Sequence, residues 1–87
     1  MPKLLIMKSF VFFIWMQDLL ENRRHVHVTK NTGRNFNAAK IWLEPTIDVA
    51  RKGDFSEKEI KEISSIVQEH KMLLLSEIDK IKKTWKD

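Results

Sequence analysis

The sequence has 87 residues and contains no cysteine. Without thiols, the chain can form neither a disulfide framework nor a thiolate metal site. This absence fits a reducing compartment, and we predict a cytoplasmic protein. A chain of this length buries only a small core, and small cores without covalent staples commonly gain stability from a partner. We therefore expect a single domain over residues 1–87 that works inside a complex.

Long apolar runs are also missing. The longest apolar stretch, residues 4–16, is interrupted by Lys8 and Ser9. It is too short to span a bilayer as a helix, and no small-residue cleavage site follows it. We expect a mature, soluble protein without a membrane partner.

Familiar catalytic motifs are absent as well. The sequence has no glycine-rich phosphate loop, nucleophile elbow or zincin motif, and no pair of acidic residues at the spacing of a catalytic site. These absences disfavour the common enzyme classes, and we predict no cofactor. They do not exclude an enzyme, and the activity that we consider is a metal-independent ribonuclease.

Positive charge is concentrated in one part of the chain. Of the net charge of +4, all lies in residues 1–54, because residues 55–87 carry seven basic and seven acidic residues. Residues 23–40 contain no acidic residue and five basic ones: Arg23, Arg24, Lys30, Arg34 and Lys40. Such a patch suits RNA, a DNA backbone or an acidic protein, although a solvated hairpin would have the same composition.

Runs of branched and aromatic residues predict β-strands. The runs cover residues 4–7, 10–16, 23–30 and 39–43, and Ile47 and Val49 extend the sheet briefly. The run at 10–16 is apolar on both faces, which predicts a central strand that is covered on both sides, or by helix on one side and by a partner on the other. Asn31 to Asn35, with Gly33, has the composition of a turn. We predict a meander of about four antiparallel strands.

The segment around His25 and His27 alternates with a period of two. This geometry places Val26 and Val28 on one face of the sheet and both histidines on the other. We predict that the valine face is buried and that the histidine face is displayed. Lys40 and Trp42 of the returning strand are candidates to share the displayed face.

This displayed face supplies the candidate functional residues. A histidine titrates near neutral pH and can act as a general acid or base in RNA cleavage, so His25 and His27 are the catalytic candidates. Cationic side chains would hold phosphates, and a tryptophan would stack on bases. The binding candidates are Arg23, Arg24, Lys30, Arg34, Lys40 and Trp42. The competing interpretation is that the two histidines simply stack or hydrogen-bond beside Trp42.

Metal binding by the two histidines is the remaining alternative. Imidazoles two residues apart on a strand can converge, but zinc usually requires a third protein ligand, and none is close in sequence. His70, Glu44 and Asp48 could approach through space, yet no pattern points to them. We predict no metal site.

The sequence after Gly53 predicts helix. Ser56 and Glu59 have the spacing of a capping box, and apolar residues then recur every three or four positions. No glycine or proline follows Gly53, so a helix of about 30 residues and roughly 45 Å is allowed. Because this exceeds the size of the domain, we predict one long bent helix, two helices with a break near residues 68–72, or an end that packs on a second copy. The run of three leucines at 73–75 predicts full burial or an interface. The chain is thus α+β, with a sheet half at 1–54 and a helical half at 55–87.

Four segments together resemble the small bacterial family labelled domain of unknown function 4160. They are the aromatic strand at 10–15, the His-Val-His-Val segment at 25–28, the Ala-Lys-Ile-Trp-Leu-Glu-Pro segment at 39–45 and the capped helical segment at 56–85. Arg23 and Arg24 stand where the family often has prolines. His70 stands where it often has an asparagine that could cap a second helix.

The resemblance implies a biological setting. Proteins of this kind are commonly encoded beside members of another family, labelled domain of unknown function 2442, in what looks like a type II toxin–antitoxin arrangement. The chain would be the toxin, neutralised by direct binding of a cognate antitoxin from that second family. The family supplies no agreed catalytic residues. A non-enzymatic domain that binds nucleic acid or protein is the alternative function.

Overall fold

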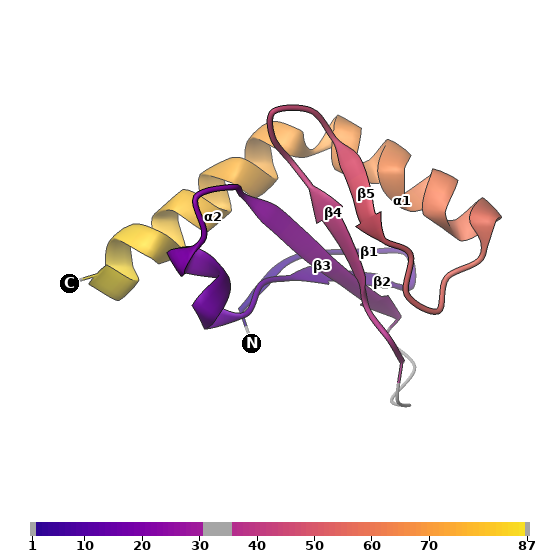
Figure 1. Ribbon diagram of the computed structural model, residues 1–87, viewed down its shortest axis with the longest axis horizontal. Helices are drawn as coiled ribbons and strands as arrows, with labels where there is room; N and C mark the ends of the chain where they lie inside the picture. The colour runs from indigo at the N-terminus through magenta and orange to yellow at the C-terminus, as the bar shows by residue number, and fades with distance from the viewer. Residues whose placement is uncertain (1, 31–35, 87) are drawn as a thin grey trace.

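A five-stranded antiparallel sheet and two α-helices that follow it make up the fold (Figure 1). The computed structural model describes residues 2–30 and 36–86. The elements are β1 (Lys3–Met7), β2 (Phe10–Phe13), the 3-10 helix η1 (Met16–Leu20), β3 (His25–Lys30), β4 (Ala39–Trp42), β5 (Asp48–Arg51), α1 (Glu57–Glu69) and α2 (Lys71–Lys86). The predicted α+β class is confirmed. The predicted turn at residues 31–35, with Gly33, lies outside the described residues.

The strands follow one another in the order β1-β2-β3-β4-β5, so the predicted meander is also confirmed. The sheet has five strands rather than about four. The brief extension expected around Val49 is a full strand, β5, which pairs with β4 through Ile41 opposite Val49. The chain reverses between the two strands across Pro45, a residue that cannot donate to a strand ladder.

The strand β2 ends at Phe13, three residues earlier than predicted. The backbone N–H of Trp15 donates to Asp18 Oδ2 at 2.8 Å, which begins the helical turn η1. Before β2, Lys8 has a φ of 57°, the left-handed conformation that tight hairpin turns require. Every side chain of β2 is buried, so its predicted coverage on both faces is confirmed.

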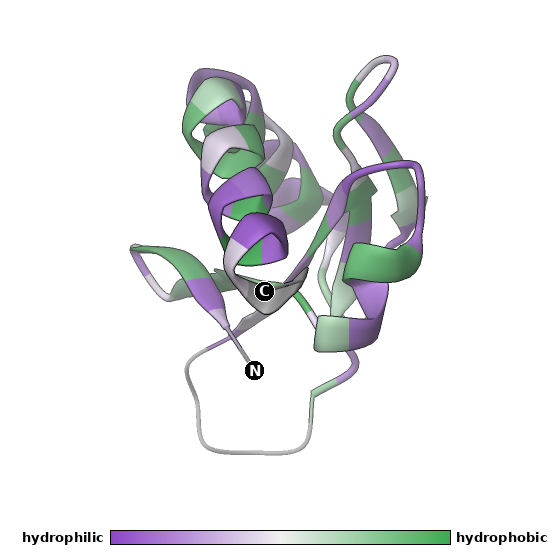
Figure 2. Ribbon diagram, turned by 90° about the vertical axis from the view of Figure 1, so that its left-hand side faces the viewer, coloured by the Kyte–Doolittle hydropathy of each residue, from purple (hydrophilic) through white to green (hydrophobic). Residues whose placement is uncertain are grey.

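The main core lies between one face of the sheet and the two α-helices (Figure 2). Val26 and Val28 are fully buried there, as the alternation predicts. The same face of the sheet also contributes Phe10, Phe12, Ala39 and Ile41. The helices contribute Ile63, Ile66, Val67, Leu74 and Ile78.

The helical half consists of two helices that meet at His70. The predicted capping box opens α1: Glu59 N–H donates to Ser56 Oγ at 3.2 Å, and Ser56 N–H donates to Glu59 Oε1 at 3.0 Å. α1 ends at Glu69, within the region where a break was predicted. In α2, Leu74 is buried but Leu73 is 43 % exposed, so the prediction of full burial across the leucine run is wrong. The reason is that α2 buries only one stripe against the sheet.

None of the helices in the described part of the chain is both long enough and apolar enough to cross a membrane.

Candidate functional site

In β3 and β4, the face that points away from the helices carries four of the predicted functional residues. His25 lies opposite Trp42, and His27 lies opposite Lys40, in the register of β3 and β4. The strands therefore bring both histidines, Lys40 and Trp42 to one face, as predicted. The prediction that the histidines are displayed is wrong, because His25 is 3 % exposed and His27 is 6 % exposed.

Aromatic rings cover the histidines by forming a row across the strands. Neighbouring ring centroids are separated by 5.3 Å, 5.5 Å, 5.1 Å and 5.2 Å along the row. The row runs in the order Trp15, Phe13, His27, His25 and Trp42. The interpretation that the histidines stack beside Trp42 is confirmed for His25, whose ring meets the indole edge to face. The two histidines thus belong to a second, smaller buried layer on this face of the sheet.

Asp18 completes a cluster with the two histidines, which we call the Asp18 triad (Asp18, His25 and His27). Its Oδ2 lies 2.9 Å from His27 Nε2, and its Oδ1 lies 3.2 Å from His25 Nε2. One ligand atom from each of the three residues falls within 4.8 Å of the others. The side chain of Asp18 is only 11 % exposed. The third potential ligand is thus Asp18 in η1, rather than any of the three residues considered from the sequence.

The hydrogen bonds of the Asp18 triad are incomplete. His25 Nδ1 lies 3.2 Å from the carbonyl oxygen of Arg23 and must donate its proton there, since a carbonyl oxygen only accepts. His25 Nε2 is buried and has no hydrogen-bond partner in the part of the chain that the structure describes. His27 Nδ1 is likewise buried and unpartnered among the described residues. Burial lowers the pKa of His27, with only partial compensation from Asp18, so this imidazole is neutral at pH 7.

Two cations gather over the indole of Trp42. The guanidinium carbon of Arg23 lies 4.0 Å from the ring centroid, and Lys40 Nζ lies 4.4 Å from it. Arg51, on the exposed strand β5, is the register partner of Lys40. We call Arg23, Lys40, Trp42 and Arg51 the Trp42 cluster. Among the ion pairs between described residues, none involves its three cations.

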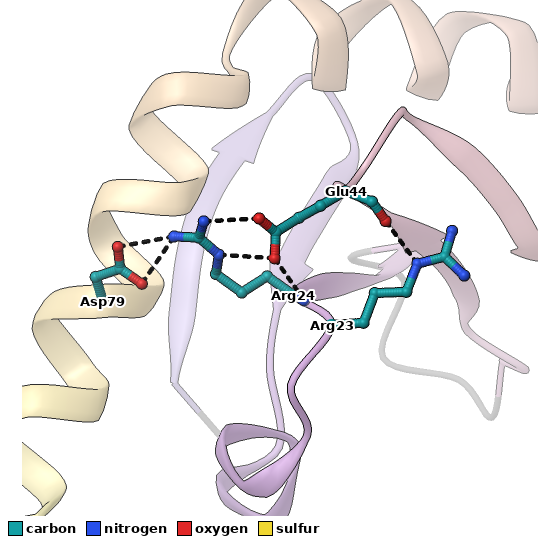
Figure 3. Close-up of polar contacts among 4 residues, drawn as sticks. All are labelled: Arg23, Arg24, Glu44 and Asp79. Atoms are coloured by element: carbon teal, nitrogen blue, oxygen red, sulfur yellow. Dashed lines mark hydrogen bonds and ion pairs between the residues drawn. The ribbon is translucent and has the colours of Figure 1, made fainter.

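Arg24 is engaged by two carboxylates instead. It donates to both oxygens of Glu44, from Nη2 at 2.7 Å and from Nε at 3.0 Å, and its Nη1 donates to both oxygens of Asp79 in α2 (Figure 3). The hydrogen bonds from Arg24 lower the pKa of Glu44 to about 2. In return, the two carboxylates raise the pKa of the guanidinium. This network joins β3, the turn after β4 and α2. A role for Arg24 in binding nucleic acid stays a prediction.

The remaining predicted binders are not part of the Trp42 cluster. Lys30 Nζ forms an ion pair with Glu59 Oε2 at 2.5 Å, and this contact lowers the pKa of Glu59. Arg34 lies outside the described residues. Of the six predicted binders, the structure brings three together: Arg23, Lys40 and Trp42.

Sequence reasoning missed Asp18 and Arg51. Asp18 stands three residues after Trp15, and at this spacing a carboxylate can accept a hydrogen bond from the backbone N–H at the start of a helix. This spacing was the signal that could have located Asp18. Arg51 would have been placed beside Lys40 if the sequence around Val49 had been read as a full strand.

The arrangement has two chemical capacities. The Trp42 cluster presents cations and an aromatic ring, which can bind the phosphates and bases of a single-stranded nucleic acid. The Asp18 triad is buried beneath it and offers two imidazole nitrogens and a carboxylate. A catalytic role for its histidines stays a prediction.

Comparison with known proteins gives one result. No curated protein and no solved structure matches the chain significantly. The family model described as "Domain of unknown function (DUF4160)" matches residues 9–77, a span that contains β2 to β5, α1 and the first turns of α2. The chain therefore belongs to the DUF4160 family.

Proposed function

We propose that this protein is the toxin of a bacterial type II toxin–antitoxin pair, that it acts on RNA through the Trp42 cluster, and that a cognate antitoxin of the family domain of unknown function 2442 neutralises it. The observation that supports action on RNA is the gathering of Arg23 and Lys40 around Trp42, with Arg51 on the next strand. Membership of DUF4160 supports the setting.

The chemistry of the Trp42 cluster favours single-stranded RNA. Cations bound over an aromatic ring can turn outward to phosphates, and the ring then becomes available to a base. Trp42 is half-buried, so one part of the indole anchors it to His25 while another part remains accessible. A sheet surface with basic and aromatic side chains is a recurrent way to hold unstacked bases.

An exposed apolar site on α2 supports the antitoxin contact. Met72 is 79 % exposed and Leu73 is 43 % exposed, and the two are adjacent at the start of the helix. Exposed apolar neighbours of this kind commonly mark protein contacts. We assign this site to the antitoxin. The other candidate is a second copy of the chain bound through α2, and size measurements on the isolated chain would detect such a dimer.

A growth assay tests the toxin proposal. Induced expression of the chain alone should arrest bacterial growth, and co-expression of the protein encoded beside it should restore growth and co-purify with the chain. Harmless expression, together with the absence of a co-purifying neighbour, would contradict the proposal.

A binding assay tests the surface. Fluorescence anisotropy with labelled single-stranded RNA should show salt-dependent binding, and Arg23→Ala or Lys40→Ala should each reduce the slope of log K against log salt by about 0.7. Lys61→Ala is the control, because Lys61 is exposed on α1, away from the Trp42 cluster. Equal losses in all three variants would show that binding reflects net charge alone.

A second candidate function is a non-enzymatic domain that binds RNA. The burial of His25 and His27 favours it, because an imidazole buried within the row of rings cannot reach a scissile phosphate without rearrangement. Intact RNA after prolonged incubation with the protein, together with salt-dependent binding, would support this function over cleavage. Cleavage that is abolished when both histidines are replaced by alanine would support the ribonuclease.

A further inference from the structure

We propose that Asp18, His25 and His27 form a binding site for a divalent transition-metal ion of the Zn²⁺ type. The site lies beneath the sheet surface and does not depend on the proposed action on RNA. Two imidazole nitrogens and one carboxylate oxygen are a ligand set that such ions accept.

The spacing of the ligand atoms fits an ion of this size. Two atoms bound to one tetrahedral zinc ion at about 2.0–2.1 Å lie roughly 3.3 Å apart. In the structure, the Asp18 carboxylate lies 2.9 Å from His27 Nε2 and 3.2 Å from His25 Nε2. All three ligand atoms fall within 4.8 Å of one another, so small side-chain shifts would enclose an ion.

The unpartnered Nε2 of His25 is an independent indication of a bound ion. The side chain is 1 % exposed, and among the described residues its Nε2 has no hydrogen-bond partner although Asp18 Oδ1 is 3.2 Å away. A buried polar nitrogen without a partner costs free energy, and an ion held by this nitrogen and the Asp18 carboxylate would remove that cost. The bond from His25 Nδ1 to a backbone carbonyl is also the outer contact that metal-binding histidines usually make.

A small cavity adjoins two of the three residues of the triad. Asp18 and His25 line this cavity of about 10 Å³, together with Glu21 and Arg24. This is about the volume that one water molecule needs. A tetrahedral ion with three protein ligands needs one more ligand, and we assign that position to water.

The same chemistry excludes other ions. Ca²⁺ and Mg²⁺ prefer shells made of oxygen atoms, and the triad supplies only one carboxylate. Soft ions such as Cu⁺ prefer sulfur, which the triad lacks. An ion at this position would also fix η1 to β3, because its ligands come from both elements.

Metal titration of the full chain tests the proposal. After dialysis against a chelator, isothermal titration with Zn²⁺ should give one ion per chain, and Co²⁺ should give the visible absorption of a tetrahedral site. Asp18→Asn and His27→Gln should each weaken Zn²⁺ binding by more than about 100-fold, since even outer contacts are worth 10- to 100-fold. His70→Gln is the matched control, because His70 lies at the junction of α1 and α2 and should leave binding unchanged.

Nitrogen-15 spectra of the imidazoles provide a readout that needs no variant to fold. Addition of Zn²⁺ to the unmodified protein should shift Nε2 of His25 and of His27 and leave His70 unaffected. Absence of Zn²⁺ binding would overturn the proposal. So would binding that survives Asp18→Asn at full strength, or zinc-dependent shifts confined to His70.

Discussion

The ion network around Arg24 gives the most direct test of the structure. Glu44 accepts from three nitrogens of Arg24: the backbone N at 3.1 Å, Nε at 3.0 Å and Nη2 at 2.7 Å. Arg24 also binds Asp79, so the network holds α2 against the residues that precede β3 and follow β4 (Figure 3). The substitution Glu44→Gln removes the charge and one strong acceptor while it preserves the shape of the side chain. We expect it to destabilise the protein at neutral pH.

The magnitude follows from the pKa of Glu44. Its pKa falls from an ordinary 4.5 to about 2, and this difference corresponds to at most about 3.4 kcal/mol at 1.36 kcal/mol per pH unit. The side chains of Arg24 and Glu44 are 31 % and 32 % exposed, so solvent screening reduces the figure. We expect Glu44→Gln to lower the free energy of unfolding by roughly 1.5–2 kcal/mol. For a domain of this size, the melting temperature falls by roughly 6–16 °C.

The effect should depend on pH in a defined direction. A carboxyl group whose pKa is lower in the folded state stabilises the fold above its unfolded pKa and loses this contribution as pH falls through its folded pKa. The unmodified protein should therefore lose the Glu44 contribution between about pH 4.5 and pH 2. The difference between the unmodified protein and Glu44→Gln should be full at pH 7 and close to zero near pH 2.

Urea denaturation followed by circular dichroism at several pH values measures these differences. Glu77→Gln is the matched control, because Glu77 is 34 % exposed and, among the described residues, pairs only with Lys80 at 3.5 Å within α2. It should cost less than about 0.5 kcal/mol. The reasoning is refuted if both variants cost the same at pH 7, or if the cost of Glu44→Gln is unchanged at pH 2.5.

Four further substitutions, of which Leu73→Ala is the control for Leu74→Ala, test the fold by the same denaturation assay. Gly53→Ala should cost roughly 1–3 kcal/mol, because Gly53 has a φ of 63° and a Cβ there would clash with the carbonyl oxygen of Asn37; a neutral result would contradict this close backbone approach. Leu74→Ala should cost about 2–5 kcal/mol, because the side chain is fully buried between α2 and the sheet, whereas Leu73→Ala should cost less than about 1 kcal/mol; equal costs would contradict the orientation of α2. Ser56→Ala should cost about 1 kcal/mol through loss of the α1 cap, and a cost near zero would show that the capping box is dispensable.

The sequence alone determined the features that depend on local periodicity. Alternation placed Val26 and Val28 in the core, and the spacing of Ser56 and Glu59 located the start of α1. Both patterns are local, because a strand alternates its faces and a helix cap spans three residues whatever else the chain does. The meander followed from the same kind of reasoning. The sequence left open whether the helical half is one bent helix or breaks near residues 68–72, and the structure shows the break at His70.

Only the tertiary structure decided what the second face of the sheet carries. Alternation assigns His25 and His27 to that face but cannot say whether another segment covers it, and here Asp18 of η1 and the neighbouring rings do so. Charge counting treated Arg24 and Arg23 alike. The fold then paired Arg24 with Asp79, 55 residues away, and left Arg23 over Trp42. Such pairings depend on contacts between distant parts of the chain, and no local pattern in the sequence records them.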